Sequence, residues 1–176
     1  MTERLIIAGS GGQGVMLLGK ILAEAGMREN RFVTWLPSYG AEVRGGTSHC
    51  MVVISDKTIG SPYIEKADTL IVMNQPSLKK FRQRLAGKGL LIINSSLVSS
   101  KGPKNAKTLP RPFTDIAIKI GNIKVANTVA LGAYLAKKKT VSLRTVDRVI
   151  VERGSKGHKH LIRVNQEALQ EGVKIA

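Results

Sequence analysis

Four of the seven residues in the stretch 8–14 (AGSGGQG) are glycine, and this stretch directly follows an apolar run at residues 5–7. Apolar residues recur at helical spacing over residues 14–27, so a helix is expected immediately after the glycines. A strand that turns through glycines into a helix is the first half of a strand–helix–strand unit. The glycine-rich stretch therefore predicts a sheet with parallel strands that is covered by helices.

The rest of the chain alternates in the same way between short apolar runs and amphipathic stretches. Strands are expected at residues 4–8, 31–36, 49–55, 69–73 and 90–94, and helices at 14–27, 76–85, 126–138, 142–153 and 164–173. Residues 99–112 contain three prolines and are expected to form a polar connection. Continuous apolar strands separated by helices indicate an α/β, Rossmann-like fold: a mostly parallel sheet with helices on both faces.

The length and composition limit the kind of protein this can be. The 176 residues are expected to form one domain, residues 1–176. No apolar run approaches the roughly 20 residues that span a bilayer, so no membrane partner is expected. The single cysteine, Cys50, cannot hold an iron–sulfur cluster, which takes about four thiolates. His158 and His160 are too few for a metal site, so no metal ligands are predicted. The expected compartment is the cytoplasm.

The formal net charge of +16 indicates either an anionic partner or a lysine-rich surface that keeps the protein in solution. Nucleic acid, an acidic protein and a phosphate-bearing ligand all fit such a charge. Aromatic residues, which stack on single-stranded bases, make up only 4% of the chain. Nucleic acid is therefore the weaker choice of partner, and the two interpretations of the charge stay open.

The turn between the first strand and the first helix matches the pattern G-x-G-x-x-G. The matching residues are Gly9, Ser10, Gly11, Gly12, Gln13 and Gly14. In that pattern glycines allow a tight turn, and a pyrophosphate approaches the backbone N–H groups at the helix start. The second strand ends without the Asp or Glu that would hold the ribose of NAD, so a different phosphate-bearing ligand is expected. A glycine turn used only for packing is the alternative.

A second unusual stretch, PSYGAEVRGGTSHC at residues 37–50, follows the second strand. Open α/β sheets bind ligands along the edge where parallel strands end, so this stretch is expected at a pocket rim or a subunit contact. Its candidate residues are Tyr39, Glu42, Arg44, Gly45 and Gly46. A local Glu42–Arg44 ion pair that only pins the loop is the alternative. Asn74 and Ser95 follow later strands and are further candidates, although residues at strand ends often only cap turns.

Taken together, GSGGQG and YGAEVRGG resemble the gamma subunit of 2-oxoacid:ferredoxin oxidoreductases, which is fused into one long polypeptide in some pyruvate enzymes. Further agreement comes from residues 61–74 (SPYIEKADTLIVMN), 89–98 (GLLIINSSLV) and 127–135 (NTVALGAYL). The resemblance covers nearly the whole chain. One departure is Ala41, where the family often has proline.

The resemblance implies a reaction in which a 2-oxoacid is decarboxylated on thiamine diphosphate, electrons pass to ferredoxin and coenzyme A captures the acyl group. It also implies alpha, beta and delta subunits, which would carry the thiamine diphosphate, its Mg and the iron–sulfur clusters. This chain would not be catalytic alone and would form one wall of a shared site. The expected ligand of the glycine turn is then coenzyme A, with Gln13 adding a side-chain hydrogen bond. The favoured substrate is 2-oxoglutarate, because small separate gamma subunits are common in its enzymes.

Two alternatives to this assignment stay open. A subunit of indolepyruvate oxidoreductase contains a similar domain. A basic module that binds nucleotides or nucleic acid would use the same glycine turn and would explain the charge of +16. Steeply salt-dependent binding to DNA or RNA would favour that module.

Overall fold

A six-stranded sheet forms the centre of the protein. The computed structural model describes residues 1–38, 47–100, 102–103, 105–155, 157 and 159–176. Its strands are β1 (Thr2–Ser10), β2 (Phe32–Ser38), β3 (Thr47–Ser55), β4 (Ala67–Val72), β5 (Leu85–Asn94) and β6 (Lys107–Arg111), in the spatial order β2-β3-β1-β4-β5-β6. β3 is antiparallel to both of its neighbours, and the other three pairs of strands are parallel. The predicted mostly parallel α/β sheet is confirmed.

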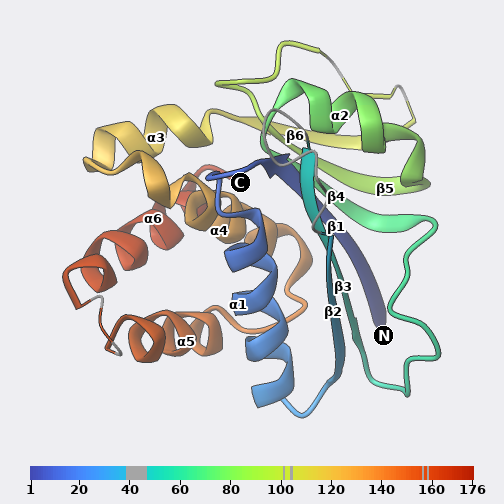
Figure 1. The fold of residues 1–176 in the computed structure, drawn as a ribbon, viewed down its shortest axis with the longest axis horizontal. Coiled ribbons are helices and arrows are strands. Elements are labelled where there is room, and N and C mark those ends of the chain that lie inside the picture. Colours follow the sequence, from blue (N-terminus) through green and yellow to red (C-terminus); the bar gives the residue numbers. More distant parts are fainter. Residues whose placement is uncertain (39–46, 101, 104, 156, 158) are drawn as a thin grey trace.

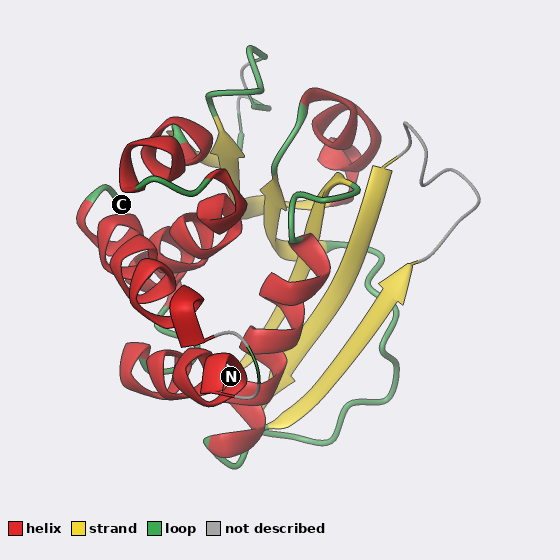
Figure 2. Ribbon diagram, turned by 60° about the vertical axis from the view of Figure 1, so that its left-hand side comes forward, coloured by secondary structure: helices red, strands yellow, loops and turns green. Residues whose placement is uncertain are grey.

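Helices lie on both faces of this sheet, as predicted, but unequally. The helices are α1 (Val15–Arg28), α2 (Gln75–Phe81), α3 (Phe113–Ile120), α4 (Ala126–Lys138), α5 (Leu143–Ser155) and α6 (Ile162–Lys174). Figure 1 shows α1 and α3–α6 gathered on one side of the sheet and α2 on the other. In Figure 2 the larger group of helices forms a thick layer beside the strands. Within the described residues, every helix is too short or too polar to span a lipid bilayer.

The hydrophobic core is divided in two by the sheet. Leu5 and Ile7 of β1 pack on the side of α1 and α4, whereas Ile6 and Ala8 pack on the side of α2. All four side chains are fully buried. Successive side chains of a strand point to opposite faces, so a central strand between two helix layers must be apolar at every position. This is why the first apolar run is continuous rather than alternating.

The two edges of the sheet are the parts that sequence patterns predicted least well. The expected polar connection at residues 99–112 contains β6, in which only Leu109 is buried, so it lacks the apolar run of an inner strand. The helix α3 that follows was not predicted. At the other edge, β2 continues through Pro37, where the strand was expected to end. Proline is tolerated there because an edge strand has one side with no ladder hydrogen bonds to lose.

Two glycines allow α4 and α6 to cross at backbone contact. A Cβ atom added at Gly132 would collide with the carbonyl oxygen of Leu169, and one added at Gly172 would collide with the carbonyl oxygen of Val129. Both obstacles are backbone atoms of the opposite helix, which cannot move aside by changing a rotamer. The close crossing of these helices therefore requires glycine, which has no Cβ atom, at both positions.

Gly172→Ala is expected to lower the free energy of unfolding by at least about 2 kcal/mol, because overpacking a tight contact forces the backbones apart. Urea denaturation followed by circular dichroism measures this change. The control is Gly60→Ala, where an added Cβ meets nothing within 4 Å. The control should stay within about 1 kcal/mol of the parent protein. Equal effects at the two positions would contradict the close crossing.

Candidate functional site: the glycine turn between β1 and α1

The turn from β1 into α1 has the backbone geometry that its glycines suggest. Gly12 has a φ of 87° and Gly14 a φ of 70°, both in the left-handed region that favours glycine. Gly11 and Gly12 are exposed at the tip of the turn. The turn follows β1 in the interior of the sheet, beside the parallel strand β4. It therefore stands at the edge where open α/β sheets bind ligands.

The side chain of Gln13 holds this turn in place. Its Oε1 accepts a hydrogen bond from the backbone N–H of Ser10 at 2.7 Å, and its Nε2 donates to the carbonyl oxygen of Met73 at 3.1 Å. The backbone N–H of Gln13 donates to the carbonyl oxygen of Ser10 at 3.2 Å. Gln13 thus joins the turn to the end of β4. Its predicted bond to a ligand stays a prediction, and the structure adds a role inside the turn.

The start of α1 is open to an anion. Within the described part of the chain, the backbone N–H groups of Gly12 and Gly14 have no hydrogen-bond acceptor. Gly14 precedes α1 without a side-chain cap, and the first turn of the helix contains no acidic residue. Unpaired N–H groups and the helix dipole favour a negative charge at such a position. The geometry fits the phosphate or carboxylate group of a ligand.

Asn127, near the start of α4, also supports the glycine turn. Its Nδ2 donates to the carbonyl oxygen of Gly14 at 3.1 Å, across 113 residues of sequence. Its Oδ1 accepts from the backbone N–H of Thr128 at 2.9 Å. A Cβ atom added at Gly14 would lie only 2.5 Å from Asn127 Nδ2. Gly14 is therefore required both for its left-handed backbone and for the close approach of α4.

A buried polar group beside the turn was not among the predicted site residues. Asn94, at the end of β5, donates from Nδ2 to the carbonyl oxygen of Met73 at 3.2 Å and to Thr114 Oγ1 at 2.9 Å. The side chain of Asn94 is fully buried. The only sequence signal for it is a polar residue that ends the apolar run LLIIN. Asn94 thus fixes the acceptor on which Gln13 also depends.

The predicted rim residues have different outcomes. Asn74 caps α2, because its Oδ1 accepts from the backbone N–H of Ser77 at 3.0 Å. Ser95 is exposed, and its backbone N–H donates to the carbonyl oxygen of Arg111 at 2.9 Å. These contacts belong to the turns and leave a role in ligand binding untested.

The five candidates of the second unusual stretch lie outside the described residues. They are Tyr39, Glu42, Arg44, Gly45 and Gly46. The residues that flank the stretch are Ser38 and Thr47, and Thr47 pairs with Ser10 at the start of the glycine turn. The stretch therefore connects the end of β2 to the start of β3, the strand that pairs with β1 beside the glycine turn. Its role at a rim or a subunit contact stays a prediction.

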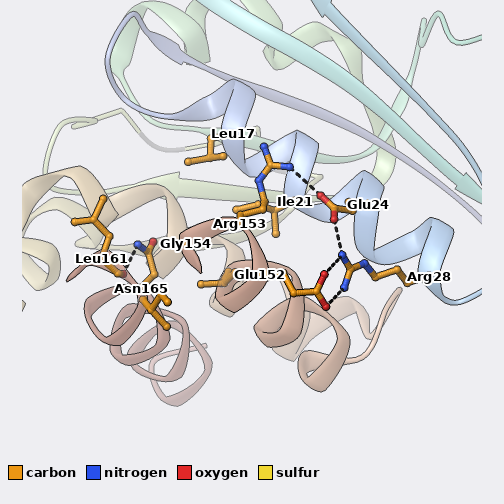
Figure 3. Close-up of a pocket in the computed structure, with 11 residues that line it drawn as sticks. Leu17, Ile21, Glu24, Arg28, Glu152, Arg153, Gly154, Leu161 and Asn165 are labelled. Carbon is orange, nitrogen blue, oxygen red and sulfur yellow. Dashed lines mark hydrogen bonds and ion pairs between the residues drawn. The ribbon is translucent and has the colours of Figure 1, made fainter. Parts of the chain in front are cut away.

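A separate pocket of about 500 Å³ lies between α1, α5 and the start of α6. Figure 3 shows its charged end, where Arg28 binds both carboxylate oxygens of Glu152, at 2.8 and 2.7 Å. Arg28 also binds Glu24 at 2.7 Å, and Arg153 binds the other oxygen of Glu24 at 2.8 Å. The hydrogen bonds that Arg28 donates to Glu152 and, to a smaller extent, to Glu24 raise the pKa of Arg28.

These four charges compensate one another, two positive against two negative. The network ties α1 to α5 and leaves no net charge in the pocket to attract an anion. None of the predicted site residues lines this pocket. The glycine turn is therefore the better candidate for the functional site.

The described residues offer no group of three or more His, Cys, Asp or Glu that could hold a metal ion. The cysteine is also unsuited to chemistry, because burial raises the pKa of the Cys50 thiol to about 12. A protonated, buried thiol is a poor nucleophile and a poor metal ligand.

The fold and the turn define a class of protein: a Rossmann-like α/β domain with an exposed glycine turn at the end of its first strand. The chain belongs to the pyruvate ferredoxin/flavodoxin oxidoreductase family, whose family profile matches residues 4–175. The resemblance stated from the two glycine motifs is therefore confirmed.

Relatives in this family differ in length and in substrate. Ketoisovalerate oxidoreductase subunit VorA of Methanothermobacter thermautotrophicus is 38% identical over 98% of this chain, but over only 36% of its own length. The chain thus spans about a third of this relative. 2-Oxoglutarate synthase subunit KorC of Methanocaldococcus jannaschii is 33% identical over 100% of this chain and 95% of its own length.

Solved structures share the fold. The gamma subunit of a keto/oxoacid ferredoxin oxidoreductase from Geobacter sulfurreducens matches with a TM-score of 0.86 and 31% identity, over 99% of this chain and 98% of its own. A 2-oxoglutarate:ferredoxin oxidoreductase from Magnetococcus marinus, solved with 2-oxoglutarate, coenzyme A and succinyl-CoA bound, has a TM-score of 0.89. It is 21% identical over 99% of this chain and 31% of that chain, so it shows a likeness of fold alone.

Gly14→Ala is expected to destabilise the protein by about 2–4 kcal/mol, since the Cβ meets Asn127 and the backbone is strained. Asn127→Ala removes the obstacle but also the hydrogen bond to Gly14. The double variant should therefore lose about 1 kcal/mol less than the sum of the two single losses. Urea denaturation of the four proteins measures this coupling. Strictly additive losses of unfolding free energy would show that Gly14 and Asn127 are not in energetically coupled contact.

Proposed function

We propose that this chain is the gamma-type subunit of a 2-oxoacid:ferredoxin oxidoreductase, with residues 1–176 as one domain. It contributes the glycine turn as one wall of a site for coenzyme A, which accepts the acyl group in the reaction. The observation that carries the proposal is the uncapped start of α1, where Gly12 and Gly14 present backbone N–H groups without acceptors in the described chain. The chain is not catalytic alone.

Coenzyme A suits this turn because it carries phosphate groups. Its binding also does not require the Asp or Glu that holds the ribose of NAD at the end of the second strand. The exposed turn presents its N–H groups beside the positive end of the α1 dipole, which favours an anion by about 0.3–1 kcal/mol. The turn residues proposed to bind the phosphates are Gly9, Ser10, Gly11, Gly12, Gln13 and Gly14. Gln13 and Asn127 hold the turn in shape before the ligand arrives, which lowers the cost of ordering it on binding. The Magnetococcus marinus enzyme of the same fold contains coenzyme A.

The remaining chemistry is assigned to partner subunits of the alpha, beta and delta types. Thiamine diphosphate with its Mg and the iron–sulfur clusters would be held there, because a single buried cysteine cannot ligate a cluster. Ferredoxin is the proposed electron acceptor of the complex, and the cytoplasm the proposed compartment. The residues Tyr39, Glu42, Arg44, Gly45, Gly46, Asn74 and Ser95 are proposed to line the rim of the site or the contact with these subunits.

Gly12→Asp in the assembled complex is expected to raise the KM for coenzyme A at least about tenfold, a cost of about 1.4 kcal/mol. The added carboxylate repels the phosphates, whereas the KM for the 2-oxoacid and kcat at saturating coenzyme A should stay close to those of the parent. Steady-state kinetics of ferredoxin reduction measures all three values.

Gly12→Asn is the matched control, since its side chain has the same size and tolerates the left-handed backbone equally well without the charge. The control should change the KM for coenzyme A by less than about threefold, or about 0.7 kcal/mol. If both variants behave like the parent, coenzyme A phosphates do not bind at this turn.

The proposed substrate is 2-oxoglutarate. KorC of Methanocaldococcus jannaschii, one of the relatives that this chain matches over almost their full length, is named a 2-oxoglutarate synthase subunit. The longer VorA, which is more similar in sequence, is named for ketoisovalerate, and this acid is the second candidate. The complex purified from its own cells should reduce ferredoxin faster with 2-oxoglutarate than with pyruvate or ketoisovalerate. A higher kcat/KM for ketoisovalerate would replace the proposed substrate.

A further inference from the structure

A long part of the sequence contains bases but no acids. Residues 69–114 contain nine Lys or Arg and no Asp or Glu. Four of the nine fall within residues 79–84, on α2 and the short helix η2 (Arg82–Arg84) that follows it. Lys66 joins the same surface, because its Nζ donates to the carbonyl oxygen of Gln83 at 2.7 Å. The basic surface, as defined here, consists of Lys66, Lys79, Lys80, Arg82, Arg84 and Lys88.

Most of this basic surface is not neutralised by the protein itself. Lys66, Lys79, Arg82 and Lys88 are exposed, and none of them forms an ion pair with another described residue. On the opposite face of the sheet, Arg28 and Arg153 are fully paired with glutamates. Lys66, Lys79, Arg82 and Lys88 are therefore left without a carboxylate partner in the described chain. Unpaired like charges repel one another, which an acidic partner would relieve.

The basic surface also contains a fixed aromatic contact. Tyr63 is 60% exposed, and the guanidinium group of Arg84 lies 4.9 Å from the centroid of its ring. Arg84 also donates to the carbonyl oxygens of Ile64 and Glu65, so its position is set before any partner binds. Tyr and Arg are the residue types that most often dominate the binding energy of protein interfaces.

Beside this contact the sheet itself is only thinly covered. α2 is the one α-helix that the described chain places on this face (Figure 1). Leu36 of the edge strand β2 is 37% exposed and lies opposite Met51 in register. Met51 in turn accepts a hydrogen bond from the backbone N–H of Ile64, next to Tyr63. Leu36 thus adds exposed apolar surface on the face of the sheet that carries α2.

We infer that the basic surface binds an Asp- and Glu-rich surface of a partner subunit. A polypeptide fits better than nucleic acid, because Arg84 already covers one face of Tyr63, the exposed aromatic ring beside these bases that could otherwise stack on a nucleobase. The inference uses the membership of the chain in a family of multi-subunit enzymes. It does not depend on coenzyme A, since the basic surface and the glycine turn share no residue.

Carboxyl–amine cross-linking of the intact complex, purified from its own cells, tests this directly. A carbodiimide joins a lysine amine only to a carboxylate in contact with it, and mass spectrometry identifies the pair. Links are expected from Lys66, Lys79, Lys80 or Lys88 to Asp or Glu of another subunit. Links from these lysines only to Glu65 of the same chain, or only to a second copy of this chain, would overturn the inference.

Charge reversal provides the second measurement. The triple variant Lys79→Glu, Lys80→Glu, Arg82→Glu should reduce the yield of co-purified partner subunits at least about tenfold, or about 1.4 kcal/mol. The control carries the same change of charge on the other side of the sheet: Lys119→Glu, Lys124→Glu, Lys137→Glu. The control should change the yield of co-purified partner subunits by less than about twofold. Thermal melting followed by circular dichroism checks that both variants fold.

Three results would overturn the inference: equal losses in the two triple variants, no loss in either, or loss of bound nucleic acid instead of protein. The Gly12→Asp variant separates this inference from the proposed function. If the basic surface binds a partner but the glycine turn does not bind coenzyme A, Gly12→Asp leaves both assembly and KM unchanged. If instead the glycine turn binds coenzyme A but the basic surface binds no partner, Gly12→Asp raises the KM for coenzyme A and the α2 triple variant still assembles.

Discussion

The carbonyl oxygen of Met73 is the acceptor on which the candidate site depends. It lies just beyond the end of β4 and receives hydrogen bonds from Gln13 Nε2 and Asn94 Nδ2, at 3.1 and 3.2 Å. The first bond holds the glycine turn, and the second holds the end of β5. Asn127 adds a third support from α4 through Gly14. Side chains from separate elements thus fix a turn whose exposed tip consists of glycine, which alone would be too flexible to bind a ligand tightly.

Charged side chains have two roles in this structure. On the side of α1 and α5, arginines and glutamates pair with one another and join helices, at the distances expected for charge-assisted hydrogen bonds. On the side of α2, exposed lysines and arginines have few acids near them. Residues 69–114 contain nine of the 28 Lys and Arg residues and none of the 12 Asp and Glu residues. The proposed ligand site at the sheet edge and the proposed partner surface over α2 share no residue.

Elements with strong periodicity were predicted well. The helix expected at residues 126–138 coincides with α4, whose buried side chains lie at almost every position. The strands at the centre of the sheet were also predicted, because burial on both faces requires a continuous apolar run. β6 and the end of β2 were not, since an edge strand buries few side chains and tolerates proline. α3 follows β6 directly and was hidden in the same polar region.

The sequence by itself determined the strand–turn–helix start, the class of fold and the place of the glycine turn, because these depend on local periodicity and on backbone angles open to glycine. Only the tertiary structure decided what holds that turn. Gln13 and Met73 are 60 residues apart, and Gly14 and Asn127 are 113 apart. Hydrogen bonds at such separations arise from the packing of α4 and β4 beside the turn, and no short-range pattern encodes which amide meets which carbonyl.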